Sequence, residues 1–237
     1  MQISDLRLTL CYLTVQNLPL TVEGLSVHLN IPHLPNLVWH FLHEQLVQID
    51  ADIKLNDVPL SDCPVLTNTT KIRVFISVVA IYYAPSDLSS TRGMFHEHIQ
   101  AVDSWWHGPA RHDCVLVQHD PDAPGFHGLY VVWVCHFFSI HHNKTEFPCA
   151  LVSWYSTIGT TPCADMGMWK VEPDFDNTGN LAMSIIHLDS MVHSGHLMGI
   201  AGATWIPHHL TFDHSLDAFY AFYVNKYIDH HAHKYAF

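Results

Sequence analysis

The sequence predicts an α+β fold that is mainly β: a small antiparallel barrel or bent sheet with an N-terminal helix and a C-terminal closing helix. Three observations predict it. Apolar residues make up 49% of the 237 residues, which is enough for a sizeable core. Short β-branched and aromatic runs alternate with turn residues through the middle of the chain. Helical spacing of apolar residues lies on both sides of these runs.

We expect four segments, which differ in pattern. Residues 1–30 are weakly patterned, and residues 31–112 should form a helix, a strand and a long loop that pack on the core. Residues 113–205 should form the antiparallel β domain, and residues 206–237 the C-terminal helix.

The part before the β domain contains one clear helix and one clear strand. Residues 36–49 have helical spacing with Asn36 as a possible cap. Residues 72–83 are β-branched and aromatic, as in a buried strand. The Pro- and Gly-containing stretch 84–111 predicts a long loop around a short helix.

The β domain should contain five strands in a single sheet, and a helix should follow it. The strand candidates are 113–118, 129–140, 146–155, 167–173 and 183–188. The side chains expected to point inward are Val115, Val117, Val132, Val134, Ala150, Val152 and Trp169. Residues 214–228, capped by Asp213, show apolar residues at helical spacing, with Phe219, Tyr223 and Tyr227 expected to pack on the core.

The charge balance argues against nucleic acid as a partner. The chain has 22 acidic and 10 basic residues, and its net charge is −12. Its four arginines, Arg7, Arg73, Arg92 and Arg111, are scattered, so no basic groove is expected. If the protein has a partner, the charge favours a basic protein segment.

The cysteines and the start of the chain predict an intracellular protein, nuclear or cytoplasmic, that is neither secreted nor in a membrane. The six cysteines contain no C-x-x-C pair, which favours buried reduced thiols. The first residues lack a basic region before their apolar run, and charged residues interrupt that run.

The 22 histidines raise the question of a metal site. The candidate clusters are His96-Glu97-His98, His193 with His196, His208-His209 with His214, and Asp229-His230-His231 with His233. None matches a recognised ligand spacing, so we predict no metal, cofactor or catalytic residue. The paired acids Asp120/Asp122 and Asp174/Asp176 are expected in turns. Nothing in the spacing of Asp113, Asp120, Asp189 and Asp217 singles out an acidic triad among them.

Mutational decay offers another origin for the histidines. Most arginine codons begin with CG, and cytosine-to-thymine change there yields His, Gln, Cys or Trp. Four arginines beside 22 His, 7 Trp and 6 Cys is the direction that this decay predicts.

Several blocks of the sequence resemble one family. These are YYAPSDLSSTRGM (82–94), GPARHDCVLVQHDPDAPGFHGL (108–129), FPCALVSWYS (147–156), GMWKVEPDFD (167–176), SIIHLDSMVHSGHLMGI (184–200) and SLDAFYAFYVNKYIDHHAH (215–233). In order and spacing they resemble the C-terminal region of Plavaka-type, CACTA-like transposon proteins of basidiomycete fungi. The resemblance covers nearly everything after about residue 28.

The resemblance indicates where the catalytic residues of such an element lie and where this chain differs from the family pattern. It implies that the catalytic residues of such an element lie upstream of this region. It also implies arginine where this chain has His40, His98, Trp133 and His193, in agreement with decay. The family pattern is also not followed at Ser90, Thr91, Phe95 and His96, at Trp105, Trp106 and His107, or in residues 160–165 before Gly167.

We therefore expect a non-catalytic, transposon-derived accessory or interaction domain, decayed and lacking the transposase catalytic region. Two alternatives stay open: a module that binds chromatin protein or DNA, and a metal-dependent enzyme with histidine ligands. Stoichiometric zinc in the purified protein would favour the second alternative, and heparin retention at low salt would favour DNA binding.

Overall fold

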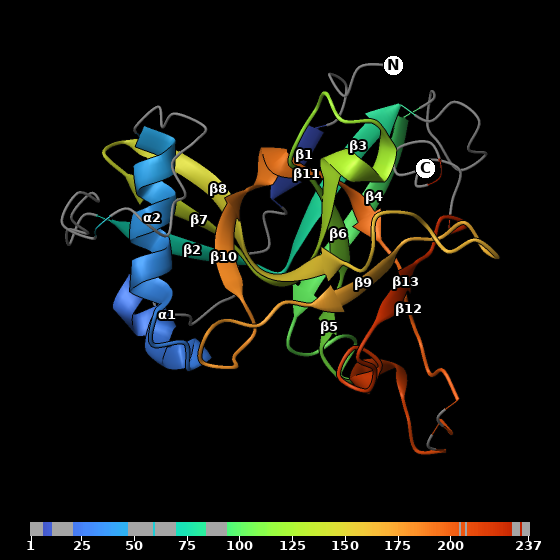
Figure 1. The fold of residues 1–237 in the computed structure, drawn as a ribbon. Helices are drawn as coiled ribbons and strands as arrows, with labels where there is room; N and C mark the ends of the chain where they lie inside the picture. Colours follow the sequence, from blue (N-terminus) through green and yellow to red (C-terminus); the bar gives the residue numbers. More distant parts are fainter. Residues whose placement is uncertain are drawn as a thin grey trace.

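The protein folds around a long antiparallel sheet that bends into a nearly closed barrel (Figure 1). The structure, a computed structural model, describes residues 7–10, 21–46, 59, 70–83, 94–203, 205–206, 208–228 and 233. Its longer strands are β2 (Lys71–Phe75), β3 (Ser77–Tyr83), β4 (Met94–Val102), β6 (Cys114–Gln118), β7 (Leu129–His142), β8 (Thr145–Thr157), β10 (Met183–His187) and β11 (Met191–Gly195). The shorter ones are β1 (Arg7–Leu10), β5 (Arg111–His112), β9 (Lys170–Pro173), β12 (Leu197–Gly199) and β13 (Phe222–Val224).

The β7–β8 hairpin is the centre of the fold. Asn143 and Lys144 connect its strands with positive φ angles of 48° and 67°, the backbone that a tight hairpin turn requires. β7 pairs along its length with β6 and β2 on one side, and β8 pairs with β10 and β9 on the other. The pairing register shifts between Val134 and His136, and this bulge lets the long strand bend.

A corner at Ile76 joins the two sheets of the molecule. β2 ends at Phe75 and pairs with β7 in the nine-stranded sheet. β3 begins at Ser77 and pairs with β1 and β4 in the four-stranded sheet, whose order is β1-β3-β4-β5. The single strand predicted for 72–83 is therefore two strands in different sheets.

The interior of the barrel is filled by side chains from both sheets. Val78, Ala80 and Ile99 of the four-stranded sheet pack against residues of β6, β7 and β8. The seven side chains that the sequence placed inward, Val115, Val117, Val132, Val134, Ala150, Val152 and Trp169, are all buried. The five predicted strands match β6 to β10 and share one antiparallel sheet, so this prediction is confirmed.

Two helices cover the outer face of the barrel on one side (Figure 1). Helix α1 (Val22–Leu29) and helix α2 (Leu34–Leu46) bury Leu25, Val38 and Phe41 against Phe138 and other residues of the sheet. The predicted helix over 36–49 is confirmed where it is described, but it begins before Asn36, which lies inside it. Residues 47–49 lie outside the described residues.

The predicted C-terminal helix over 214–228 is wrong. Phe212–His214 form a short 3-10 helix, residues 215–221 form turns and bends, and Phe222–Val224 form β13, which pairs with β12 and β9. The alternation of buried Phe222 and Val224 with the less buried Tyr223 is a strand pattern, and pairing with the sheet overrides the helical spacing of the wider segment. A third core cluster, with Trp169, Val171 and Phe222, lies under this strand.

One weakly patterned segment contains regular structure, and one further sequence prediction is wrong. The region 1–30, described in part, contains β1 and α1, whose eight residues are too few to show a clear periodicity. A long loop with a short helix is expected over 84–111, but the described part of this segment contains β4 and the start of β5. His96, Glu97 and His98 lie in β4 although their side chains are polar. Residues 84–93 lie outside the described part. No helix within the described residues is long and apolar enough to cross a membrane.

Candidate functional site

A groove of about 710 Å³ lies at one end of the barrel. It is lined by residues of β5, β6 and β7, by residues 195–197 between and within β11 and β12, and by residues 213–217 that precede β13. We call it the acidic groove. Its lining residues are Trp105, Pro109, Ala110, Arg111, His112, Asp113, Cys114, Trp133, Gly195, His196, Leu197, Asp213, Ser215, Leu216 and Asp217.

A tight turn presents Trp105 to the groove. Trp106 and His107 have positive φ angles of 50° and 63°, and the backbone N–H of Gly108 donates to the carbonyl oxygen of Trp105 at 2.8 Å. The hydroxyl of Ser104 donates to the carbonyl oxygen of Gly108 at 3.0 Å, which braces the same turn. The two neighbouring tryptophans consequently differ, because Trp105 is half-buried at the groove while Trp106 is 83% exposed and does not line it.

Trp105 and Asp113 together hold the guanidinium of Arg111. The guanidinium carbon of Arg111 lies 5.0 Å from the centroid of the Trp105 ring, in cation–π geometry. The same guanidinium donates from Nε to Oδ1 of Asp113 at 3.0 Å and from Nη2 to Oδ2 at 3.2 Å. Asp113 is fixed in turn, because its Oδ2 accepts the backbone N–H of Gln100 at 2.8 Å. This corner of the groove therefore combines an aromatic face with a positioned carboxylate.

Residues 213–217 add two more carboxylates to the groove, those of Asp213 and Asp217. A hydrogen bond from the hydroxyl of Thr211 lowers the pKa of Asp213, so this carboxylate is charged at neutral pH. The groove thus presents three aspartates and one arginine, with His112 and His196 as its further titratable bases. Its potential favours a positively charged occupant and disfavours phosphate.

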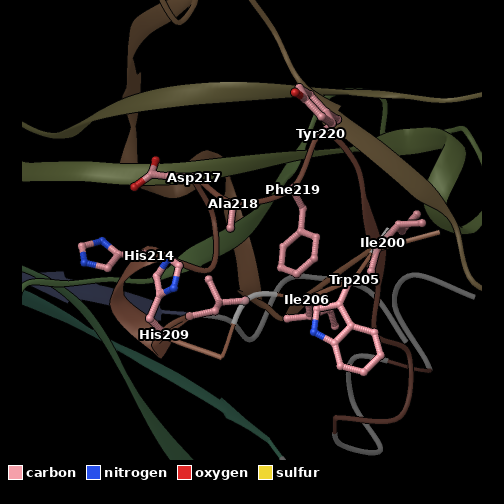
Figure 2. A pocket seen from close by; sticks show the side chains of 11 residues that line it. Ile200, Trp205, Ile206, His209, His214, Asp217, Ala218, Phe219 and Tyr220 are labelled. Carbon is pink, nitrogen blue, oxygen red and sulfur yellow. The ribbon is translucent and has the colours of Figure 1, made fainter. Parts of the chain in front are cut away.

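An apolar pocket of about 490 Å³ adjoins the acidic groove. Its lining residues are Ile200, Ala201, Trp205, Ile206, His209, Leu210, His214, Asp217, Ala218, Phe219 and Tyr220. Figure 2 shows the rings of Phe219 and Trp205 on one side, with the imidazoles of His209 and His214 together on the other. Asp217 lines both hollows, so the two share one wall.

The histidine clusters of the sequence are placed in different environments. His193 is buried, and its Nε2 lies 3.3 Å from the hydroxyl of Tyr82, whereas His196 is exposed and contacts Asn225. His96 and His98 lie on the exposed face of β4, while Glu97 between them bonds Ser194. Among the described residues, no group of three His, Cys, Asp or Glu side chains is arranged to hold a metal ion.

The third and fourth clusters differ in how far they can be followed. His209 and His214 line the apolar pocket and His208 does not. Of the cluster Asp229-His230-His231 with His233, only His233 is described; Cys11 and Cys63 also lie outside the described residues.

Asp120, Asp122 and Asp176 lie in turns or bends, whereas the backbone of Asp174 pairs with Trp154 and Ala182 beside the sheet. Oδ1 of Asp120 accepts the backbone N–H of Asp122 at 2.9 Å, and Oδ1 of Asp176 accepts that of Thr178 at 2.8 Å. Of the four aspartates from which an acidic triad could be assembled, Asp113 and Asp217 line the acidic groove, whereas Asp120 and Asp189 do not. The carboxylate of Asp113 already accepts hydrogen bonds from the guanidinium of Arg111 and from the backbone N–H of Gln100, so in the groove it is suited to binding a cation.

Comparison with known proteins adds no identity. The chain matches no protein-family model, and no curated protein is significantly similar to it in sequence.

Sequence reasoning missed the residues that make the groove: Trp105, Arg111, Trp133, Asp213 and Leu216. One pattern could have indicated part of it, because a Trp-Trp pair directly before Gly108-Pro109 places large aromatic side chains in a turn. An exposed aromatic in a turn, followed closely by Arg111 and Asp113, is unusual for a purely structural loop. The contribution of residues 213–217 depends on tertiary contacts alone.

Proposed function

We propose that the protein is a non-catalytic interaction domain that binds a basic segment of a partner protein in the acidic groove. The observation that carries the proposal is the bound Arg111: the groove already holds a guanidinium between the Trp105 ring and the carboxylate of Asp113. A partner's arginine or lysine can use the same kind of contacts with Trp133, Asp213 and Asp217. The net charge of −12 draws such a partner in from a distance.

We further propose that the domain derives from the C-terminal region of a Plavaka-type transposon protein. The environment of His193 supports this origin. The resemblance places arginine at that position, and the structure has a carboxylate, Glu97, whose Oε2 lies 3.9 Å from Nδ1 of His193 in the interior. A half-buried glutamate is the natural partner of an arginine. An intracellular location, nuclear or cytoplasmic, is part of this proposal and is supported by the buried thiols of Cys114, Cys135 and Cys149.

Binding is tested by fluorescence anisotropy with a labelled peptide of alternating arginine, lysine and glycine. Asp217→Asn should weaken binding by about three- to tenfold, because it removes one carboxylate while keeping its shape. Trp105→Ala should weaken peptide binding to a similar degree, because the ring of Trp105 lines the groove and holds the guanidinium of Arg111 in place. Matched controls are Asp122→Asn, an exposed acid outside the groove, and Trp106→Ala, the adjacent tryptophan that does not line it.

Two results would contradict the proposed function. One is that the peptide fails to bind at 50 mM salt. The other is that the control variants weaken binding as much as the groove variants, which would indicate attraction to the net charge alone. Tighter binding of single-stranded or duplex DNA than of the peptide would favour the nucleic-acid alternative.

A further inference from the structure

The connection between β12 and β13 forms the apolar pocket. The backbone N–H of Ile200 donates to the carbonyl oxygen of Ala221 at 2.9 Å, so the described residues between them (201–203, 205–206 and 208–220) leave the sheet and return to it at one point. This excursion carries every residue that lines the apolar pocket. It lies at the end of the molecule away from the two helices (Figure 1).

The floor of the apolar pocket is anchored in the core. The ring of Phe219 presses on the backbone of Gly199, where an added Cβ would collide with it. Phe219 also contacts Phe222, with ring centroids 6.3 Å apart, and Phe222 is buried. The pocket is therefore supported by packed side chains and does not depend on an occupant to keep its floor.

The rim of the apolar pocket exposes large apolar side chains. Trp205 is 79% exposed, Ile206 is 50% exposed and Tyr220 is 95% exposed. Figure 2 shows Trp205 and Ile206 beside the Phe219 ring. Apolar side chains gathered around a hollow are typical of a surface that a partner covers.

The position of Asp217 indicates what enters the pocket. Its carboxylate belongs to the wall of the acidic groove and to the wall of the apolar pocket. A chain that lies in the groove with a basic residue near Asp217 is thus brought to the edge of the pocket. The shared wall joins charge recognition on one side to apolar contact on the other.

We propose that the apolar pocket takes one bulky hydrophobic side chain of the same partner segment, next to the basic residues that the groove binds. This inference rests on the proposed function and specifies the partner: a basic segment with a leucine, phenylalanine or tryptophan close to its charges. The hydrophobic side chain supplies the affinity that surface charges alone do not.

The test compares two labelled peptides by fluorescence anisotropy, one basic and one in which a terminal glycine of that peptide is tryptophan. The tryptophan should strengthen binding at least about tenfold, as expected when such a side chain becomes buried. Trp205→Ala should remove this gain and leave the affinity for the basic peptide unchanged. Phe175→Ala is the matched control, because Phe175 is 62% exposed and lies outside the pocket.

The outcomes separate this inference from the proposed function. If the basic peptide binds and tryptophan adds nothing, or if Trp205→Ala weakens both peptides equally, the inference is overturned while the groove stands. If neither peptide binds, the proposed function fails and this inference with it. Sedimentation equilibrium identifies another occupant: a dimer that Trp205→Ala dissociates would show that the pocket binds a second copy of the chain and would overturn the proposal.

Discussion

Nδ1 of His193 in β11 lies 3.9 Å from Oε2 of Glu97 in β4. The imidazole is buried, and its Nδ1 also lies 2.8 Å from the carbonyl oxygen of Ser194, so a neutral ring that donates there can accept from Tyr82 at Nε2. The backbone N–H and the hydroxyl of Ser194 both donate to the carboxylate of Glu97. The pair connects β11 of the nine-stranded sheet to β4 of the four-stranded sheet.

This pair tests the proposed origin of the protein. His193→Arg should fold and be at least as stable as the natural protein, because the guanidinium can reach both oxygens of Glu97. The gain should disappear in the double variant with Glu97→Gln, with a coupling of about 1–3 kcal/mol in a urea-denaturation cycle. His193→Leu serves as the control for loss of the polar contact. An unfolded His193→Arg variant, or one indifferent to Glu97, would contradict the prediction.

His136 should make the stability depend on pH. Burial lowers its pKa from 6.5 to about 4, outweighing the opposing effect of Asp103. Between these values the unfolded chain binds a proton that the folded protein does not, so stability is complete above about pH 6.5 and falls as the pH drops towards 4. The loss amounts to at most about 3 kcal/mol. His136→Gln should flatten this decline in urea titrations, whereas His141→Gln, an exposed position in β7, should leave it unchanged.

Cys163 should be the most reactive thiol among the described cysteines. Hydrogen bonds from the backbone N–H groups of Asp165 and Met166 lower its pKa. Burial raises the pKa of Cys135 to about 11 and also raises those of Cys114 and Cys149. Because the thiolate is the nucleophile, iodoacetamide at pH 7.5 should modify Cys163 first, as followed by peptide mass spectrometry. Equal rates for the four thiols in the folded protein would refute this order.

The C-terminal strand should contribute substantially to stability. Phe222 is 1% exposed and contacts Tyr155, with ring centroids 5.9 Å apart. Phe222→Ala should cost about 3–5 kcal/mol of unfolding free energy. Tyr220→Ala, two residues earlier and 95% exposed, should cost less than about 0.5 kcal/mol. Similar losses for the two variants would mean that Phe222 is not buried in the core as the structure has it.

Local patterns predicted the middle of the fold because they agree there with the tertiary structure. The runs that became β6, β7 and β8 are β-branched and bounded by turn residues, and both of their faces are buried. The C-terminal segment misled because Leu216, Phe219 and Tyr223 have helical spacing, while Phe222 and Val224 are held by pairing with β9 and β12. Pairing partners far along the chain cannot be inferred from spacing within one segment.

The strand β4 and the acidic groove escaped prediction for a related reason. The polar run His96-Glu97-His98 lacks strand propensity, and its pairing with β3 decides its conformation. The groove joins β5, β7 and residues 213–217, which meet only when the barrel closes. Trp105, Arg111 and Asp113 lie close together in the sequence, but nothing in the sequence indicates that residues 213–217 lie beside them in the fold.

The β7–β8 hairpin has a consequence for how the chain folds. Its residues belong to all three core clusters, and its tight turn keeps the loop-closure entropy small. We expect this hairpin to form the folding nucleus, with the helices and β13 docking afterwards. Truncation of Val152 should then slow refolding with a φ-value well above that of Phe41 in α2 or Val224 in β13. Equal φ-values at the three sites would instead mean a diffuse transition state, in which the ends of the chain are ordered as early as the hairpin.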